Sequence, residues 1–483
     1  MPDGINSDLE KSLHSRYDPR AEAVRYIDSL RLTDTIECFI LIEPGFGFMI
    51  PVLRDKFPDR KIIILHAGKC LSRGNLTYNC AVFSSGETNL SGQTQNIKRF
   101  LETETPDIDA AKIKIIEWRP SMNYFKEAYL TLISQTAEFL KQTDAGKRTT
   151  AHFGKRWVKN FFINTNCVTK TVTFKKSDIP VIVTGSGPSL ENVLPFIKDM
   201  QEYCLIIAAS SSLTALSFAG IKPDIVITTD GGNWARKHLC FLFSNAAAST
   251  SAAALAVNLC AALPSQCSEY PFLIINDGSF WQSVVLRELS LPSIIIGQRG
   301  TVSATAAELA MQLSNGNVYL AGMDFSNNDI RTHVKPYAFD NIFFSQANRF
   351  FPVYSSAFKR SSLLKDGGSM NIYEAWFKDQ LSSWQKNIFS LTDHKIFKKA
   401  IPEKPIIKKN LKDFLSVSDI KTAQSNKKNT RFSRCAEALF TAMENQQFEN
   451  NIKNELASLL FPSDSRNVTK EDLKRKILEV IEN

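Results

Sequence analysis

The stretch "VIVTGSGPSL", residues 181–190, runs from an apolar segment directly into a glycine-rich turn. Gly185 and Gly187 permit the unusual backbone angles of a tight turn. Pro188 suits the first position of a helix, because the N–H that proline lacks has no helical partner there. A second proline, Pro195, is expected to end that helix after about two turns. The stretch therefore predicts a strand, a turn and a short helix in direct succession.

The same turn predicts a binding site for an anion. Free backbone donors at the start of the helix, together with the hydroxyls of Ser186 and Ser189, would hold a phosphate. The turn is not a P-loop, because no Lys-Ser or Lys-Thr pair follows it. It also departs from the dinucleotide fingerprint, which requires a small residue where Leu190 stands and an acid where "ASSS" follows the next strand. A tight turn without a ligand is the alternative at this point.

Apolar runs alternate with helical segments over most of the chain. A first series of strands is expected at residues 37–43, 61–67 and 112–118. The second series contains "VIVTG" (181–185), "CLIIAAS" (204–210), "DIVITTD" (224–230), "FLIIND" (272–277), "SIIIG" (293–297) and "NVYLAGMDF" (317–325). Almost continuously apolar strands are typical of parallel sheets that helices cover on both faces. The fold class is therefore α/β, with two Rossmann-like parallel-sheet domains followed by a helical C-terminal domain.

Three domains fit the length of 483 residues, since single hydrophobic cores stop growing well below this size. An N-terminal α/β domain is expected over residues 1–150, and it ends in the polar stretch "KQTDAGKRTT". A central α/β domain is expected over residues 151–370. From 371 to 483 the apolar residues recur at helical spacing, which predicts a helical C-terminal domain.

The net charge of +9 is concentrated in one basic segment, residues 395–434. This segment holds 12 Lys or Arg residues and 3 Asp or Glu residues, so it carries the whole excess of the chain. A solvated linker with basic faces explains the pattern, and a docking patch for an acidic partner is the alternative. Nucleic acid is not expected as a partner, because aromatic residues are sparse in the segment.

No targeting or membrane-spanning segment is expected. The polar start of the chain lacks the apolar core of a signal peptide, and no apolar run is long enough to cross a membrane. The nine cysteines show no CxxC or comparable ligand spacing, so neither a disulfide scaffold nor a zinc site is expected. These features predict a cytoplasmic protein with reduced thiols, without membrane insertion and without a bound metal.

Small polar residues follow several strands of the second series. Ser210 ends the second strand and Asp230 ends the third, while Thr301 and Ser303 lie between the fifth strand and the next helix. In open α/β sheets, ligands bind at the carboxyl ends of the strands. Together with the glycine turn, these residues predict a nucleotide-sized ligand at this edge of the sheet.

Five segments resemble the motility accessory factor (Maf) family in their order and spacing: "GSGPSL", "AGIKPDIVITTD", "GTVSATAAELA", "YLAGMDFS" and "THVKPY". Members of this family resemble flagellin glycosyltransferases that use CMP-activated nonulosonic acids such as pseudaminic or legionaminic acid. The core is also similar to bacterial sialyltransferases of lipooligosaccharide synthesis, whose "YAFD"-type stretch is matched by residues 337–340. The resemblance covers residues 180–340 most closely.

The resemblance implies a glycosyltransferase that moves a nonulosonic acid from CMP to Ser or Thr of flagellin, with a role in flagellar assembly and motility. Its implied partners are the CMP-sugar and flagellin. No cofactor and no metal are expected, because backbone donors and hydroxyls can stabilise a leaving phosphate. The residues that would hold or adjoin the nucleotide are Gly185, Ser186, Gly187, Ser189, Ser210, Asp230, Thr301 and Ser303.

Three residues are candidates for the chemistry. Tyr337 matches the tyrosine of the "YAFD" stretch, whose phenol can donate a hydrogen bond to the departing phosphate. The related sialyltransferases carry a His base after this stretch, but residues 341–368 contain no His. His333 is the nearest substitute in the sequence, and Asp324 is the second candidate.

Two other functions stay open. The core also resembles an archaeal hydroxymethylpterin diphosphokinase, which would transfer diphosphate from ATP. That chemistry needs Mg²⁺ held by carboxylates, and Asp230 and Asp324 are the obvious carboxylates at strand ends. A protein of the same fold that binds flagellin without catalysis is the other alternative.

Overall fold

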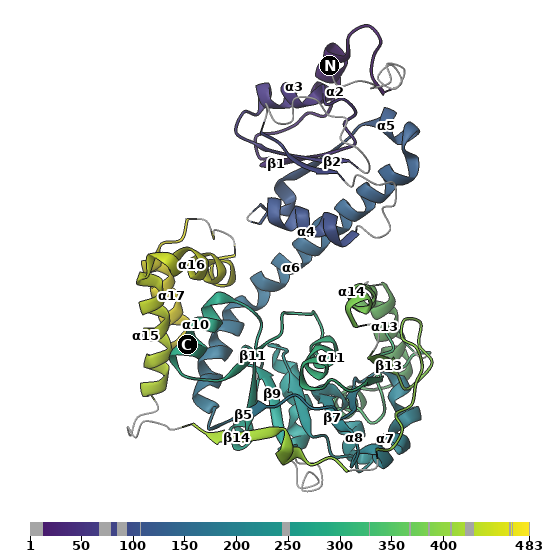
Figure 1. The fold of residues 1–483 in the computed structure, drawn as a ribbon, viewed down its shortest axis with the longest axis vertical. Helices are drawn as coiled ribbons and strands as arrows, with labels where there is room; N and C mark the ends of the chain where they lie inside the picture. Colours follow the sequence, from purple (N-terminus) through teal and green to yellow (C-terminus); the bar gives the residue numbers. More distant parts are fainter. Residues whose placement is uncertain are drawn as a thin grey trace. The chain divides into compact units, whose positions relative to one another are not determined.

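The computed structural model of the chain describes residues 13–66, 79–84, 94–106, 108–243, 252–327, 329–366, 369–384, 387–405, 408–420, 429–462, 465 and 467–482. Contacts within the chain separate two compact units, Met1–Thr149 and Thr150–Asn483. Each unit contains one sheet with helices around it (Figure 1). The predicted α/β class, with parallel sheets and a helical C-terminal part, is confirmed.

The first unit is built on a parallel sheet with the strand order β3-β2-β1-β4. Its described elements are β1 (Cys38–Ile42), β2 (Lys61–His66), β3 (Ala81–Ser84), β4 (Ile113–Glu117), α2 (Pro19–Ser29), α3 (Met49–Lys56), α4 (Thr94–Glu104), α5 (Arg119–Tyr124) and the start of α6 (Lys126–Cys167). Side chains of α2 and α3 pack on one face, and side chains of α4 and α6 pack on the other. All of β1 is buried as a result, and the three strands predicted for this unit are confirmed.

Helix α6 is 42 residues long and runs through the polar stretch at residues 141–150. The stretch stays helical because Gly146, its poorest helix former, lies among good formers such as Ala145 and Lys147. Nothing lies within 4 Å of a Cβ added at Gly146, so this glycine is not required by packing. The division between the units therefore falls inside a continuous helix, where the sequence predicts a boundary.

The second unit is built on a ten-stranded sheet in the order β13-β12-β6-β7-β8-β9-β10-β5-β14, with β11 also pairing with β10. Its strands are β5 (Lys170–Phe174), β6 (Val181–Thr184), β7 (Leu205–Ala209), β8 (Ile225–Thr228), β9 (Ala254–Asn258), β10 (Phe272–Asn276), β11 (Ser293–Ile295), β12 (Val318–Ala321), β13 (Ile388–Ser390) and β14 (Leu415–Asp419). All of these pairings are parallel except that of β14 with β5. The chain runs outward from β6 to β10 and returns to β12 on the other side of β6. The strand order therefore reverses between β6 and β12.

Helices cover both faces of this sheet (Figure 1). The helices of the second unit are α7 (Leu194–Met200), α8 (Leu213–Phe218), α9 (Arg236–Leu239), α10 (Phe280–Glu288), α11 (Val302–Leu313), α12 (Asp340–Ser345), α13 (Val353–Asp366), α14 (Ser369–Trp384), α15 (Asn429–Glu444), α16 (Gln446–Leu460) and α17 (Lys470–Glu482). The end of α6 packs on one face with α7, α8, α10 and α15–α17, while α11 and α14 pack on the other. Neighbouring residues of one strand serve the two faces, as Ile182 and Val183 do in β6.

The described part of residues 371–483 belongs to the second unit, where the sequence predicts a separate helical domain. Strand β13 pairs with β12, and β14 pairs with β5, so this part of the chain extends both edges of the sheet. Helices α15, α16 and α17 share their apolar core with α10. Glu455 of α16 accepts the N–H groups of Phe280 and Trp281 at 2.9 and 3.0 Å, which caps the start of α10.

The basic segment, residues 395–434, is attached to this sheet through its lysines. Lys409 donates to Asp224 at 2.5 Å and to the Cys204 carbonyl at 2.7 Å. Both members of the Lys409–Asp224 pair are about nine-tenths buried, with exposed fractions of 10% and 8%. Lys408 pairs with Glu202 at the surface. Residues 406–407 and 421–428 of the segment lie outside the described residues, and a linker anchored by Lys409 accounts for the part that is described.

Candidate functional site

The turns after β6 and β12 lie side by side at the carboxyl edge of the second sheet, because these parallel strands are neighbours. Open α/β sheets bind their ligands at such a point, where the strand order reverses. Gly187 donates its N–H to the Gly322 carbonyl at 2.7 Å, and Gly185 donates to the Ala321 carbonyl at 2.8 Å. Main-chain hydrogen bonds therefore hold the two turns together.

The glycines of these turns are required by the close approach of one turn to the other. A Cβ added at Gly185 would lie 2.5 Å from the Gly322 carbonyl oxygen. A Cβ added at Gly187 would lie 2.7 Å from the carboxylate of Asp324. Gly322 has a φ of +66°, a backbone angle that residues other than glycine rarely adopt. The glycine pattern is thus explained by packing between the turns, independently of any ligand.

Asp324 occupies the start of the helix that follows Gly187. Ser189 donates its N–H to Asp324 Oδ2 at 2.8 Å and its hydroxyl to Asp324 Oδ1. This differs from the expectation of a free Ser189 amide, because a carboxylate from the neighbouring turn already accepts it. The helix also differs: Pro188–Val193 is a 3₁₀ helix, and Pro195 lies in the first turn of α7 instead of ending a helix. Proline fits there because the first helical N–H groups have no partner within the helix.

The segment after β12 returns to the glycine turn and is fastened to it. Val334 donates its N–H to the Ser186 carbonyl at 2.8 Å. Glu191 accepts hydrogen bonds from the Arg331 guanidinium at 2.9 and 3.1 Å and from the Lys335 N–H at 2.9 Å. These contacts hold the predicted catalytic residues of this segment beside the turn that is predicted to bind the nucleotide.

His333 and Tyr337 form a stacked pair. Their ring centroids are 4.1 Å apart and their planes differ by 17°. His238, from α9, lies against the same tyrosine with a centroid distance of 5.4 Å. The Thr332 hydroxyl is 2.8 Å from His333 Nδ1, so Nε2 is the ring nitrogen that can reach a substrate. The three rings form one cluster at the edge of the sheet.

Burial changes the protonation of this cluster. The pKa of His333 is lowered to about 4, mainly by desolvation. The positive charges of Lys335 and Arg360 also lower this pKa, and the carboxylate of Asp340 opposes the shift. The pKa of His238 is lowered to about 4 by burial and then by His333. Burial raises the pKa of Tyr337 above its usual value. At neutral pH the cluster therefore holds two neutral imidazoles and a protonated phenol.

A cavity of about 180 Å³ adjoins the cluster and is lined by His333 and Tyr337. Asp340, on its wall, pairs with Lys335 and accepts the Tyr337 N–H at 2.8 Å. Arg360, also on the wall, lies 3.8 Å from the centroid of an aromatic ring of α12. The cavity thus combines a candidate base, a phenol donor and positive charge.

Ser210 lies one strand away from the glycine turn. It begins the short 3₁₀ turn Ser210–Ser212 after β7 and is buried. The Ser212 hydroxyl lies 2.9 Å from the Thr184 hydroxyl, which links the ends of β7 and β6. Ser210 is therefore positioned beside the glycine turn by strand pairing.

The remaining predicted residues lie further along the edge. Asp230, after β8, accepts a main-chain N–H two residues on at 2.8 Å. Thr301 caps α11 and accepts the Ser303 N–H at 3.2 Å, so both residues serve the helix start. Tyr373 of α14 lies near both turns. A Cβ added at Gly300, next to Thr301, would lie 3.4 Å from the Tyr373 ring. Burial raises the pKa of Tyr373, and the negative charge of Asp230 raises it further. Within the described residues, no hydrogen bond or ion pair joins Asp230, Thr301 or Ser303 to the His333 cluster.

Sequence reasoning missed His238, Tyr373 and His394 as neighbours of the site. His394 donates from Nε2 to the Met323 carbonyl at 3.0 Å, because its Nδ1 accepts the Ile396 N–H at 3.1 Å. This bond supports the turn that carries Asp324. No local pattern could reveal it, since the two residues are 71 positions apart.

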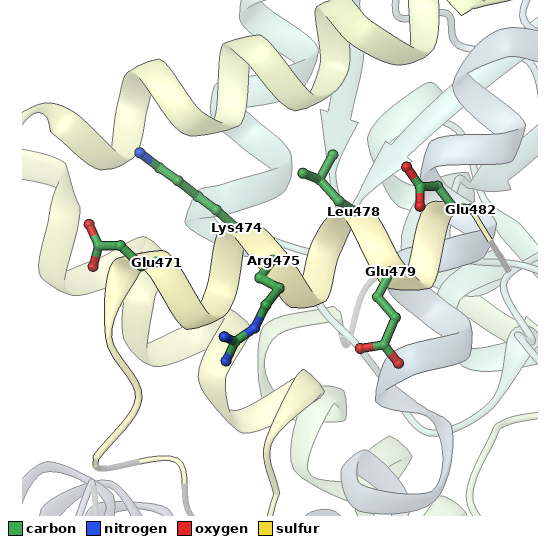
Figure 2. A pocket seen from close by; sticks show the side chains of 6 residues that line it. All are labelled: Glu471, Lys474, Arg475, Leu478, Glu479 and Glu482. Atoms are coloured by element: carbon green, nitrogen blue, oxygen red, sulfur yellow. The ribbon is translucent and has the colours of Figure 1, made fainter.

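Two other hollows involve the C-terminal helices. One lies on a face of α17, and Figure 2 shows that its lining side chains all come from this helix: Glu471, Lys474, Arg475, Leu478, Glu479 and Glu482. Lys474 is paired with Glu444, and Arg475 with Asp472. The other hollow runs between α10 and α15. Neither contains a residue of the sheet's carboxyl edge, so the cavity beside His333 is the stronger candidate.

Among the described residues, no group of three or more His, Cys, Asp or Glu side chains is arranged to hold a metal ion. The described helices likewise include none with the length and apolar character needed to cross a bilayer. The described cysteines are free thiols, and burial raises the pKa of Cys38, Cys204 and Cys267 to about 12.

Residues 155–329 match a family model described as 6-hydroxymethylpterin diphosphokinase MptE-like. Two uncharacterized proteins of Treponema pallidum (strain Nichols) are 26% and 24% identical to this chain over 260 and 115 residues. The alignments cover 53% and 23% of this chain and 56% and 55% of the relatives, so the chain spans about half of their length.

Among solved structures, the MAf glycosyltransferase from Magnetospirillum magneticum AMB-1 shares the fold of this chain. The TM-score is 0.52 and the identity is 12%, and the match covers 98% of this chain and 80% of that one. The resemblance to the Maf family is thus confirmed for the fold, and it extends beyond residues 180–340 to nearly the whole chain.

Proposed function

We propose that this chain is a glycosyltransferase that moves a nonulosonic acid from a CMP-activated donor to a Ser or Thr side chain of flagellin. One observation carries the proposal: the stacked His333–Tyr337 pair is fastened beside the paired turns at the switch point of the sheet. The fold shared with the MAf glycosyltransferase supports it. In this proposal the chain acts in the cytoplasm, needs no metal, and serves flagellar assembly and motility.

The cavity offers what the departure of CMP requires. As the bond between the anomeric carbon and the phosphate oxygen breaks, negative charge grows on the phosphate and positive charge grows on the sugar ring. The phenol of Tyr337 stays protonated because burial raises its pKa, so it can donate a hydrogen bond to that phosphate. Arg360 adds positive charge on the same wall, where the charge of Lys335 is paired with Asp340.

His333 is the candidate base for the acceptor. The acceptor oxygen forms the new bond to the anomeric carbon, its proton passes to His333 Nε2, and CMP leaves with the electrons of the broken bond. The imidazole is neutral at pH 7 because its pKa is about 4, so it can accept this proton. A base with such a low pKa is weak, which suits a transfer in which the leaving phosphate departs early.

Asp324 is better suited to support the turns than to act as the base. Both of its carboxylate oxygens accept hydrogen bonds from Ser189. Those bonds shape the turn that is proposed to carry the nucleotide, so the loss of the carboxylate would weaken binding of the donor first.

A pterin diphosphokinase is the second candidate, favoured by the family model matched at residues 155–329. It would use ATP with Mg²⁺ held by carboxylates such as Asp230 and Asp324. A flagellin-binding factor without turnover is the third, and it would bind flagellin while releasing no CMP.

Ligand-dependent unfolding separates the first two candidates. A ligand present at about 100 times its Kd stabilises the native state by about 2.7 kcal/mol. We expect CMP to raise the unfolding temperature of the second unit, and we expect ATP with Mg²⁺ and hydroxymethylpterin to give no comparable shift. The reverse ranking would favour the diphosphokinase, and CMP release from a CMP-nonulosonic acid would then be absent.

A further inference from the structure

Residues 341–365 expose an unusual number of aromatic side chains beside the candidate site. Five of them form what we call the aromatic surface, with exposed fractions between 53% and 85%: Phe344, Phe350, Phe351, Tyr354 and Phe358. A fully buried aromatic side chain removes about 150–250 Å² from water. At the exposed fractions given above, the five side chains together leave roughly 500 Å² of aromatic area in water, an amount that on soluble proteins often marks an interaction site.

The local backbone holds these rings in their exposed positions. Asn348 Oδ1 accepts the N–H groups of Phe350 and Phe351 at 2.9 and 3.0 Å, and Asn348 donates its own N–H to the Phe351 carbonyl at 3.2 Å. This closed turn presents both phenylalanines to solvent. The following helix, α13, is fastened from outside, because Asn327 donates to the Ser361 carbonyl at 2.8 Å. The exposed aromatic side chains are thus carried by a turn and a helix that hydrogen bonds hold in place.

Helix α13 connects the aromatic surface to the cavity. Val353, Ala357 and Arg360, at positions i, i+4 and i+7, share one helix face, and all three line the cavity beside His333. Tyr354 and Phe358 stand one position further round the helix and are exposed. Phe344 belongs to the aromatic surface and also lines the cavity, so a molecule lying on this surface at Phe344 would reach the cavity opening.

The charge of the segment narrows the kind of partner. Residues 341–365 contain four Lys or Arg residues and no Asp or Glu. Aromatic residues and arginine are the types most enriched in the energetic centres of protein interfaces. A partner that fits both features presents apolar side chains together with acidic ones.

We propose that the aromatic surface is the docking site of the acceptor polypeptide, which binds with a segment of apolar and acidic side chains and delivers its hydroxyl to the cavity beside His333. This inference rests on the proposed function. A polypeptide fits better than a lipid surface, because the surface continues into a cavity that must receive one side chain.

The test compares two double variants, F350S/F351S and Y354A/F358A, with the control F218A. Phe218 is also an exposed phenylalanine of the second unit, with an exposed fraction of 70%, and it lies outside the aromatic surface. Transfer is measured with purified unmodified flagellin and a CMP-nonulosonic acid, and hydrolysis of the donor is measured without flagellin. We expect each double variant to raise the KM for flagellin about tenfold or more, since loss of an interface centre has this order of effect. Donor hydrolysis and the control variant should stay unchanged.

A charge change tests the acidic part of the partner. K359E should raise the KM for flagellin, and the effect should shrink as salt is added, because exposed charges are screened. An unchanged KM in all three surface variants overturns the docking proposal while leaving the transferase intact.

Two further measurements expose the rival occupants. Loss of binding to vesicles of equal parts phosphatidylglycerol and phosphatidylcholine, with an unchanged KM, would mean a membrane surface. A change in oligomeric state, again with an unchanged KM, would mean a second copy of the chain. If the wild type turns over no donor, the proposed function fails, and direct binding of flagellin to wild type and variants still decides the docking proposal.

Discussion

Replacing Lys409 by methionine removes the cation of a buried ion pair. Lys409 and Asp224 are about nine-tenths buried and 2.5 Å apart, and Asp224 accepts one further hydrogen bond, from the Ile206 N–H at 2.8 Å. Methionine fills much of the same space but leaves the carboxylate in the core with that single partner. Breaking a buried pair in this way typically costs about 3–5 kcal/mol. We expect K409M to lower the free energy of unfolding of the second unit by that amount at pH 7.

The pH dependence of the loss identifies its cause. Burial raises the pKa of Asp224, and Lys409 and the Ile206 N–H oppose that rise. Without Lys409 the folded pKa is raised further above the unfolded value of about 3.9. The folded state then binds more protons than the unfolded state between those two pKa values, so stability recovers as the pH falls through the folded pKa. The penalty of K409M should therefore be smaller in mild acid than at pH 7.

Urea unfolding followed by tryptophan fluorescence at both pH values measures these differences. The matched control is K408M, since Lys408 pairs with Glu202 at the surface and its removal should change stability little. The double variant K409M/D224N removes the unpaired charge and should be more stable than K409M alone. A loss below about 1 kcal/mol for K409M, or one that does not depend on pH, would refute the buried-pair account.

The other predictions concern the site. Tyr337→Phe should lower the rate of transfer about 10²–10³-fold at every pH, as loss of a hydrogen-bond donor to developing charge typically does, and a rate assay with saturating donor checks it. Burial lowers the pKa of His333 from near neutrality to about 4. The kcat of the wild type should therefore stay level from pH 7 to about pH 5 and decrease at lower pH. In His333→Ala this decrease at low pH should be absent. Because His238 and His333 both have folded pKa values of about 4, below the unfolded value of about 6.5, the unfolded state binds more protons in between. Thermal unfolding should show stability that is constant above pH 6.5 and falls toward pH 4. Gly187→Ala should destabilise the second unit by about 1–3 kcal/mol, because the added Cβ would lie 2.7 Å from a carboxylate oxygen. Gly146→Ala should instead stabilise the chain slightly, because nothing lies within 4 Å of the added Cβ and alanine is the better helix former. Thermal unfolding of both variants measures these differences.

The strands with continuous apolar runs could be predicted from the sequence, because both faces of such a strand are covered. Strand β6 and the turn at Gly185 followed directly from the opening stretch. Strand β5 was missed because it lies near the sheet edge and only Thr171 and Val172 of its residues are buried. Strand β14 was missed because it is an edge strand that is mostly exposed. β9 was hidden among small alanine and serine residues, whose periodicity is weak.

The site could be predicted only in part. The positions of His333 and Tyr337 next to the glycine turn depend on hydrogen bonds to Ser186 and Glu191, more than 140 residues away. Asp324 lies at the predicted strand end, but its bond to Ser189 is a tertiary contact across 135 positions. Spacing along the chain carries no record of such contacts.

The mass of flagellin from a strain in which this chain is deleted tests the central claim most directly. The proposal predicts flagellin that lacks the mass of a nonulosonic acid at each modified residue. The wild-type chain should restore that mass, and Tyr337→Phe or His333→Ala should restore it poorly although the variant chain is present. Flagellin of the same mass with and without the chain would contradict the transferase.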